Sequence, residues 1–415
     1  MSFSCLAALA NKQSLDESKK YGILLTDLSK AFDCLCHDLI IAKLHAYGFD
    51  HLSLKLIHNY LSDRFQRVRV NSFYSRWFKI LTGVPQGSIM GAHIYNFNSN
   101  DLFFFILTDV CNFADDNSPF TVAPTISKVK CQLENKAALL LDWIENNGLK
   151  SNPEKFNLIL SEKNAKDKIQ LADVDIYSSE TVKLLGMKID SKLTFNDHVT
   201  DLCKKASSKL HALARISNYM TLKQRKIIMN TFITSHFGYC SLVWMFHSRS
   251  LNNRINKIHE KALRLVYNDS LSSFEELLEK DNSFTIHERN IQTLAIELYK
   301  VANNISPEIM KLVFPLENKL RYPNQNIFIT SNVKTVSWGT ESLRHIGPKI
   351  WQKIPNSINN LKTFNLFKNK IREWKPKNCP CRLCKPFLES ASFLGMVEVI
   401  YFYSHFLYSY FILDF

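Results

Sequence analysis

The stretch Cys111-Asn112-Phe113-Ala114-Asp115-Asp116 decides how this chain is interpreted, because two adjacent carboxylates follow an apolar run. That run, Phe103–Leu107, predicts a buried strand, and the Asp-Asp-Asn-Ser-Pro sequence that begins at Asp115 predicts a turn at its end. Two neighbouring negative charges at a hairpin tip repel each other, and a divalent metal ion with oxygen ligands removes that repulsion. The alternative is a solvated, Asp-rich turn, because short acidic motifs often occur without a metal.

A third carboxylate lies far upstream in a similar setting. Asp27 follows the strand-like run Tyr21–Thr26, so two strand ends can bring Asp27 and Asp115 together. Such carboxylates can hold two Mg²⁺ ions, one that lowers the pKa of an attacking hydroxyl and one that stabilises a leaving pyrophosphate. In-line phosphoryl transfer needs little beyond this and positioning. Phe32 follows closely and is either a core residue or a ring that checks a sugar for its 2′-hydroxyl.

The composition favours a polyanionic partner. The 415 residues include 52 Lys and Arg against 38 Asp and Glu, a net charge of +14, which favours nucleic acid first and an anionic membrane second. A hydrophobic content of 46% excludes a mainly disordered protein. The first residues carry no basic leader, so we expect no signal peptide, reduced cysteines, and a cytoplasmic or nuclear location.

Several segments predict local structure that matters for a site. Arg64, Arg67 and Arg69 alternate with apolar residues, which indicates a strand or hairpin with one basic face, either solvated or in contact with nucleic acid. Residues 82–88 form a Gly/Pro loop that opens a helix, with Ser88 as its cap. Residues 127–147 predict an amphipathic helix that Gly148 ends. From Asn196 onward the pattern is mostly helical, with basic outer faces that are either solvated surface or phosphate contacts.

Five groups of residues then stand in a fixed order. They are Asp27-Leu28-Ser29-Lys30-Ala31-Phe32-Asp33, Gly83-Val84-Pro85-Gln86-Gly87-Ser88, Phe113-Ala114-Asp115-Asp116, Gly148-Leu149 with Asn152-Pro153-Glu154-Lys155, and Leu184-Leu185-Gly186. In this order and spacing they resemble the motifs of a non-LTR retrotransposon reverse transcriptase, and the jockey-like class is the nearest match. The motifs cover residues 21–190, and the likeness extends loosely over the helical remainder to about Cys384.

The resemblance implies an α+β fold: a right-hand polymerase palm, made of an antiparallel sheet with helices, followed by a mostly helical thumb. We expect a palm with residual fingers over residues 1–190, a thumb-like region over 191–314, and a C-terminal region over 315–415. The implied activity is RNA-directed DNA synthesis by two-metal nucleotidyl transfer. The implied partners are an RNA template, a DNA primer, deoxynucleoside triphosphates and two Mg²⁺ ions.

The resemblance also implies a role for each matching residue. Asp27 and Asp115 would bind the metals, with Asp116 beside them as the third catalytic carboxylate. The substrate-binding residues would be Phe32 as the sugar gate, Gln86 and Gly87 at the template and incoming nucleotide, and Lys155 near the pyrophosphate. Leu185 and Gly186 would belong to the primer grip.

The chain departs from the family pattern in three regions. After Ser88, where the family helix is apolar, the run to Asn100 is more polar, with Asn96, Asn98 and Asn100. Only 26 residues precede Asp27, where the family has a large fingers region with basic side chains for the triphosphate, so we expect an N-terminally truncated element. Pro119 falls on the strand after the Asp-Asp pair, where its missing N–H removes a ladder hydrogen bond. Enzymatic activity therefore stays open, and the alternative is a catalytically inactive, basic nucleic-acid-binding remnant.

Two C-terminal features remain. Cys379, Cys381 and Cys384 resemble the C-terminal Cys cluster of these elements, but zinc sites want four ligands and no His stands close by, so we do not expect zinc there. The aromatic tail 393–415 is long enough to span a bilayer, but Glu398, His405 and Asp414 interrupt it. We expect read-through sequence or packing onto the body rather than a membrane anchor, and no clear membrane partner.

Overall fold

The computed structural model describes residues 12–106, 110–162, 167–171, 173–317, 327–376 and 379–384. The chain divides into two compact units, Met1–Asp201 and Leu202–Phe415, and each is described by itself. The finer boundaries expected at residues 190 and 314 stay a prediction.

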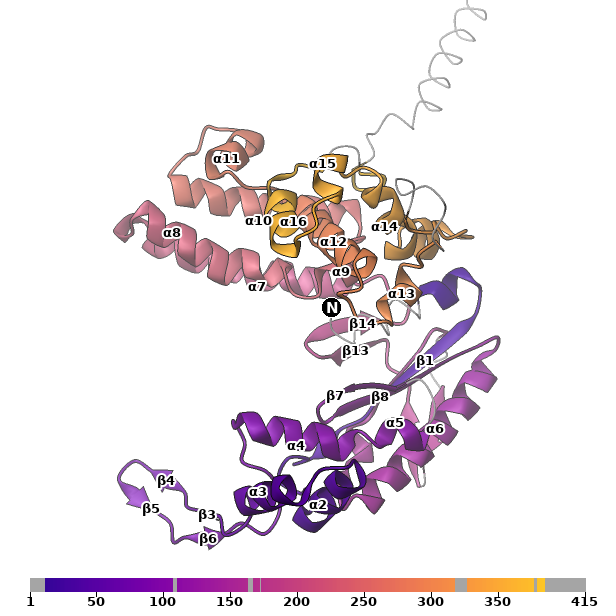
Figure 1. Cartoon of the computed structure of the whole chain (residues 1–415). Coiled ribbons are helices and arrows are strands. Elements are labelled where there is room, and N and C mark those ends of the chain that lie inside the picture. The colour runs from indigo at the N-terminus through magenta and orange to yellow at the C-terminus, as the bar shows by residue number, and fades with distance from the viewer. Residues whose placement is uncertain are drawn as a thin grey trace, which may run out of the picture. The chain divides into compact units, whose positions relative to one another are not determined.

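The first unit is built on a four-stranded antiparallel sheet with the order β10-β1-β8-β7 (Figure 1). Its strands are β1 (Lys20–Leu25), β7 (Val110–Phe113), β8 (Asp116–Ala123) and β10 (Asn157–Leu160). In β1, Tyr21, Ile23 and Leu24 are almost completely buried. Strand β1 is central, because it pairs with β10 on one side and with β8 on the other.

Helix α6 (Ile126–Asn146) covers one face of this sheet. Its buried side chains recur at helical spacing, and Gly148, with φ +66°, follows its end. Gly22 in β1 lets the helix approach closely, because a Cβ there would lie 2.6 Å from Leu133 Cδ1 and 2.7 Å from Val129 Cγ1. The predicted helix over 127–147 and its glycine stop are thus confirmed to within one residue.

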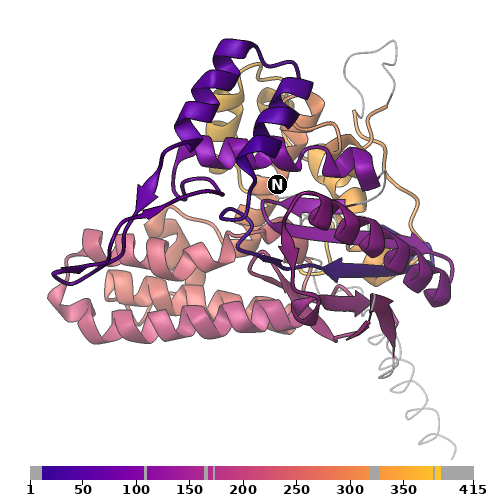
Figure 2. The same cartoon turned by 90° about the horizontal axis from the view of Figure 1, so that it is seen from below.

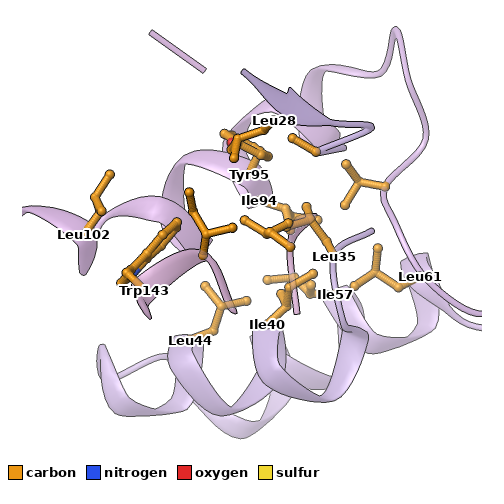
Figure 3. Packing of buried hydrophobic residues seen from close by; sticks show 14 of the residues in the cluster. Leu28, Leu35, Ile40, Leu44, Ile57, Leu61, Ile94, Tyr95, Leu102 and Trp143 are labelled. Atoms are coloured by element: carbon orange, nitrogen blue, oxygen red, sulfur yellow. The ribbon is translucent and has the colours of Figure 1, made fainter. Parts of the chain in front are cut away.

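A second core lies among the helices of the same unit, and Figure 3 shows it from close by. Its helices are α2 (His37–Ala46), α3 (His51–Leu61), α4 (Ile89–Ser99) and α5 (Leu102–Ile106). Ile40 and Leu44 of α2 meet Ile57 and Leu61 of α3, and Trp143 of α6 joins the same cluster. This core joins the loops after Asp27 and before α4 to the sheet.

The prediction of a strand over Phe103–Leu107 is wrong. Helix α5 occupies Leu102–Ile106, Leu107 lies outside the described residues, and the strand before the Asp-Asp turn is β7. Only Leu102 and Ile106, four positions apart, are buried, whereas the three phenylalanines between them are exposed. That spacing is the period of a helix, and a short apolar run does not reveal it by hydrophobicity alone.

Small two-stranded antiparallel pairs complete the first unit. They are β2 (Leu28–Ser29) with β9 (Lys150–Ser151), β3 (Phe65–Gln66) with β6 (Phe78–Lys79), β4 (Arg69–Val70) with β5 (Phe73–Tyr74), β11 (Lys168–Leu171) with β12 (Val174–Tyr177), and β13 (Thr181–Leu184) with β14 (Met187–Asp190). The last of these pairs, β13 with β14, is a hairpin. Leu185 (φ +46°) and Gly186 (φ +81°) form its two-residue turn, where both residues take the left-handed conformation.

The second unit is mostly helical, as predicted. Its longer helices are α7 (Asn196–Ile216, which begins in the first unit), α8 (Leu222–Ile228), α10 (Arg249–Tyr267), α11 (Phe274–Asp281), α12 (Ile286–Ala302), α14 (Leu343–Trp351) and α16 (Phe364–Glu373). Short helices α9 (Ser241–Trp244), α13 (Met310–Val313) and α15 (Asn356–Asn359) lie between them. Helix α12 is central, and its Tyr299 ring stacks on Phe367 of α16 with centroids 4.1 Å apart.

The basic residues Arg254, Lys257 and Lys261 lie on the outer face of α10, as expected. Within the described ranges, none of the helices is both long and apolar enough to cross a membrane. The tail 393–415 falls outside those ranges.

Candidate active site

The sheet brings the predicted carboxylates together. Because β1 and β8 are antiparallel neighbours, the end of β1 lies beside the start of β8. Thr26 fixes this end: its backbone N–H and its hydroxyl both donate to the Asn117 carbonyl, at 3.1 and 2.7 Å. Asp27 follows Thr26 and Asp116 precedes Asn117, so the two carboxylates leave neighbouring strand ends.

The turn that carries Asp115 is short and closely held. Phe113 pairs with Asp116, which leaves Ala114 and Asp115 as a two-residue loop, and Ala114 takes φ +53°. The Asn112 side-chain amide donates to the Ala114 carbonyl at 2.9 Å and to Asn117 Oδ1 at 2.7 Å. These bonds tie the turn to both strands, so the acidic pair sits on a rigid support.

Electrostatics show that the carboxylates act on one another. The pKa of Asp116 is raised above its usual value, first by partial burial and then by the negative charges of Asp115 and Asp27. Asp116 therefore lies within interaction range of both Asp115 and Asp27. An arrangement of oxygen-only ligands that disfavours its own negative charge suits a divalent cation.

A cleft of about 250 Å³ opens at these strand ends. It is lined by Asp27 and Asp116, by Lys155, and by Lys183, Leu184 and Leu185 of the β13–β14 hairpin. Lys155 Nζ lies 3.7 Å from Asp27 Oδ2, with both side chains well exposed. The structure thus brings Asp27, Asp116, Lys155 and Leu185 into one cleft, with Gly186 in the adjoining turn.

A second pair of segments lies next to the carboxylates. The loop 82–88 is bonded to the loop after Asp27: Val84 N–H donates to the Phe32 carbonyl at 2.9 Å, and Gln86 Nε2 donates to Asp33 Oδ1 at 2.9 Å. Gly83 is required here, because it has φ +85° and a Cβ would lie 2.7 Å from the Asp33 backbone. Gln86 and Gly87 are exposed, and Ser88 caps α4 as predicted.

Tyr95 of α4 is a site residue that the sequence analysis missed. Its buried ring stacks on Phe32 with centroids 4.4 Å apart, and burial together with the charges of Asp115 and Asp116 raises the pKa of its phenol. Phe32 itself is half-buried and packs against the helical core, so it has a core contact as well as a place near the carboxylates. Tyr95 gave no signal in sequence, because an aromatic residue in a helix is normally a core residue.

Lys183 was also missed. It lines the cleft from the polar side of β13, where Val182 and Leu184 are the buried neighbours. The sequence did contain a signal for Lys183: apolar and polar residues alternate just before Leu184-Leu185-Gly186, which places Lys183 on the polar face of a strand that leads to that motif.

Pro119 lies in β8, as predicted, and its effect on the sheet is local. The paired register of β1 and β8 ends at Ile23–Phe120, one pair before Leu24 would face Pro119. The bond from Thr26 N–H to the Asn117 carbonyl continues the same register beyond the interruption. The proline therefore costs a ladder contact without displacing the acidic turn.

Comparison with known proteins adds the family context. A family model described as "Reverse transcriptase (RNA-dependent DNA polymerase)" matches residues 2–189. The "Probable RNA-directed DNA polymerase from transposon BS" of Drosophila melanogaster is 27% identical over 271 residues, which cover 61% of this chain and 30% of that protein. The "RNA-directed DNA polymerase from mobile element jockey" of the same organism is 25% identical, covering 60% and 29%. The chain thus spans about 30% of the length of these relatives.

Solved structures give a weaker likeness. The apo telomerase of Candida tropicalis matches with a TM-score of 0.37 and 11% identity, covering 74% of this chain and 54% of that chain. The telomerase of Candida albicans, in complex with a fragment of telomeric RNA, matches with a TM-score of 0.32 and 16% identity, covering 74% and 52%.

The acidic site predicts a stability effect. Without added metal, Asp116→Asn should raise the thermal unfolding midpoint at pH 7 by on the order of 1–2 °C, because the folded state disfavours the ionised form of Asp116. Since the folded-state pKa is raised, this gain is present above that pKa and disappears as the pH falls through it. Differential scanning fluorimetry at several pH values measures it.

Asp173→Asn is the control, because Asp173 is an exposed carboxylate that does not line the cleft. Its midpoint should stay unchanged. A lower midpoint for Asp116→Asn than for the unmodified chain would show that carboxylate repulsion is not a feature of the folded site.

Proposed function

We propose that residues 2–189, which match the reverse transcriptase family model, are a reverse transcriptase domain of the jockey-like non-LTR retrotransposon class, and that the chain is an RNA-directed DNA polymerase. The observation that supports the proposal most is the set of three carboxylates at the adjoining ends of β1 and β8. The proposed partners are an RNA template, a DNA primer and deoxynucleoside triphosphates.

Reverse transcriptases generally use divalent metal ions, and we infer two Mg²⁺ ions held by Asp27 and Asp115, with Asp116 beside them. Such ions supply a lowered pKa for the primer hydroxyl and neutralise charge on the leaving pyrophosphate. The protein's own contribution is to hold the carboxylates in place. Thr26 and Asn112 do so through the hydrogen bonds at the strand ends, so the repulsion among the acidic groups persists in the folded chain.

The remaining residues in the cleft are suited to binding phosphates and the primer. Lys155 places a positive charge near Asp27, where it would contact the phosphates of the incoming nucleotide, and Lys183 adds a second cation in the same cleft. Leu185 and Gly186 would hold the primer end, since the β13–β14 turn reaches the carboxylates. The turn has a fixed left-handed geometry, which gives it a defined shape.

The loop pair beside the carboxylates would position the nucleotide and the template. Gln86 and Gly87 are exposed at the start of α4 and would contact the template and the incoming nucleotide. Phe32, supported by the stacked Tyr95 ring, would exclude a 2′-hydroxyl by its bulk. The hydrogen bond between Gln86 and Asp33 keeps these two groups in register.

We propose that a second surface, the segment 64–80, also contacts nucleic acid, and we call this segment the basic hairpin. It projects from α3 in Figures 1 and 2 and comprises β3, β4, β5 and β6. Arg67 lies over the rings of Tyr74 and Trp77, at 4.0 and 4.6 Å from their centroids. Trp77 is 59% exposed, so an aromatic face and a cation are both presented to solvent. This combination favours single-stranded nucleic acid, whose bases stack and whose phosphates attract cations.

Primer extension tests the proposed activity. On an RNA template with a DNA primer and Mg²⁺, the chain should add deoxynucleotides, and Asp115→Asn should reduce the rate roughly a hundredfold or more, because one metal ligand is lost. Asp173→Asn is the charge-matched control and should keep the rate. Extension that Asp115→Asn leaves unchanged would refute the site. RNA binding that weakens with salt, without extension by any variant, would instead identify the inactive binding remnant.

Selection against ribonucleotides tests Phe32. Phe32→Ala should lower the preference for deoxynucleotides over ribonucleotides roughly tenfold or more, because the sugar loses a steric check. Phe49→Ala is the matched control, since Phe49 is also half-buried against the same core and meets Phe97 at 5.4 Å. An unchanged preference in Phe32→Ala, measured by single-nucleotide addition, would leave Phe32 with only its core contact.

Equilibrium binding tests the basic hairpin. Trp77→Ala should weaken binding to single-stranded RNA roughly fivefold to a hundredfold, the effect of one lost stack. Arg67→Gln should reduce the slope of log affinity against log salt by about 0.7, the effect of one lost phosphate contact. Tyr177→Ala removes a similarly exposed aromatic residue of β12 and should change neither quantity. Equal weakening by Trp77→Ala and Tyr177→Ala would contradict the contact.

A further inference from the structure

Four potential metal ligands converge in the second unit, where the sequence showed only three. The Sγ atoms of Cys379, Cys381 and Cys384 and a ring nitrogen of His287 all lie within 4.8 Å of one another. Cys381 Sγ is 3.2 Å from His287 Nε2. His287 stands near the start of α12, far from the cysteines in sequence. The fold therefore supplies the fourth ligand whose absence argued against zinc.

We propose that His287, Cys379, Cys381 and Cys384 bind one structural zinc ion that ties residues 379–384 to the beginning of α12. Tetrahedral zinc with three thiolates and one imidazole separates its sulfurs by about 3.8 Å and sulfur from nitrogen by about 3.6 Å. The observed spacing needs only small side-chain adjustments to reach that geometry. Four protein ligands leave no open position, which is typical of structural rather than catalytic zinc.

Burial supports a metal over a chance cluster. Cys381 is completely buried, Cys379 and His287 are each only 5% exposed, and Cys384 is the exposed member of the group. Apolar burial explains single cysteines, but it gives no reason for three sulfurs and an imidazole nitrogen to meet at one point. A shared ion does, because each group donates an electron pair to it.

The two halves of the site are held by contacts that do not involve the ligands. Thr285 and Glu288 form a capping box at the start of α12, which fixes the backbone around His287. Gln292 Nε2 donates to the Trp374 carbonyl at 2.8 Å, which attaches the segment before the cysteines to α12. The Arg382 N–H donates to Glu341 Oε1 at 2.9 Å and holds the loop between Cys381 and Cys384. These contacts therefore position both halves of the site independently of the four ligands.

Charge is also favourable. The N-terminus of a 17-residue helix such as α12 carries partial positive charge, which stabilises thiolates nearby. Arg249 Nη2 donates to the Arg382 carbonyl at 3.2 Å, so a guanidinium lies at the same loop. Three thiolates and one Zn²⁺ together carry a net charge of minus one. The positive helix N-terminus and the Arg249 guanidinium offset that charge.

Metal analysis of the full chain tests the proposal independently of polymerase activity. Purified with a thiol reductant and without chelator, the chain should contain about one zinc per molecule by mass spectrometry of the element. His287→Gln and Cys384→Ser should each lose most of it. His259→Gln, a buried histidine of α10 outside the four-ligand group, and Cys131→Ser, an exposed cysteine of the first unit, should keep it. A zinc-free chain, or equal zinc content in all four variants, would overturn the proposal.

Alkylation of the unmodified chain avoids any variant that fails to fold. Zinc should protect Cys379, Cys381 and Cys384 from iodoacetamide, and a chelator should expose them, whereas Cys131 should react in both states. Reaction of the three cysteines at equal rates with and without chelator would count against the site. So would a disulfide between two of them in the reduced preparation.

Discussion

The repulsion among Asp27, Asp115 and Asp116 is the constraint on which the rest of the first unit depends. Three carboxylates lie at the adjoining ends of β1 and β8, and the pKa of Asp116 is raised first by partial burial and then by the charges of Asp115 and Asp27. The sheet supplies the compensation, because the buried side chains of β1 and the α6 interface lock the register that places them there. Stability elsewhere thus maintains a site whose negative charges repel one another.

The segments around the carboxylates are connected by backbone hydrogen bonds as well as by side-chain ones. The loop 82–88 bonds to the loop after Asp27 along its main chain, and Gly83 has no space for a Cβ there. The β13–β14 turn reaches the cleft with two residues in the left-handed conformation. Contacts of this kind hold positions closely, because a backbone hydrogen bond has few degrees of freedom. They also explain why glycines stand inside the motifs: each allows a conformation or an approach that other residues resist.

The elements that the sequence predicted correctly are those with a strong local signal. Helix α6 has a full helical period and a glycine stop, and the Ser88 cap follows directly from the Gly/Pro loop before it. The run Phe103–Leu107 was misassigned because five apolar residues fit a strand or a helix equally well. Burial of Leu102 and Ile106 alone decides for the helix, and burial depends on what packs against the segment.

By itself the sequence determined the identity and order of the motif residues, the basic balance and the helical character of the second half, since each depends on residue type and local spacing. Only the tertiary structure decided which distant residues meet. It stacked the Tyr95 ring on Phe32, placed Lys183 in the acidic cleft, and brought His287 to the three cysteines. Such meetings depend on how helices and strands pack, and a lone tyrosine, lysine or histidine gives no sign in one sequence of the partner that folding brings to it.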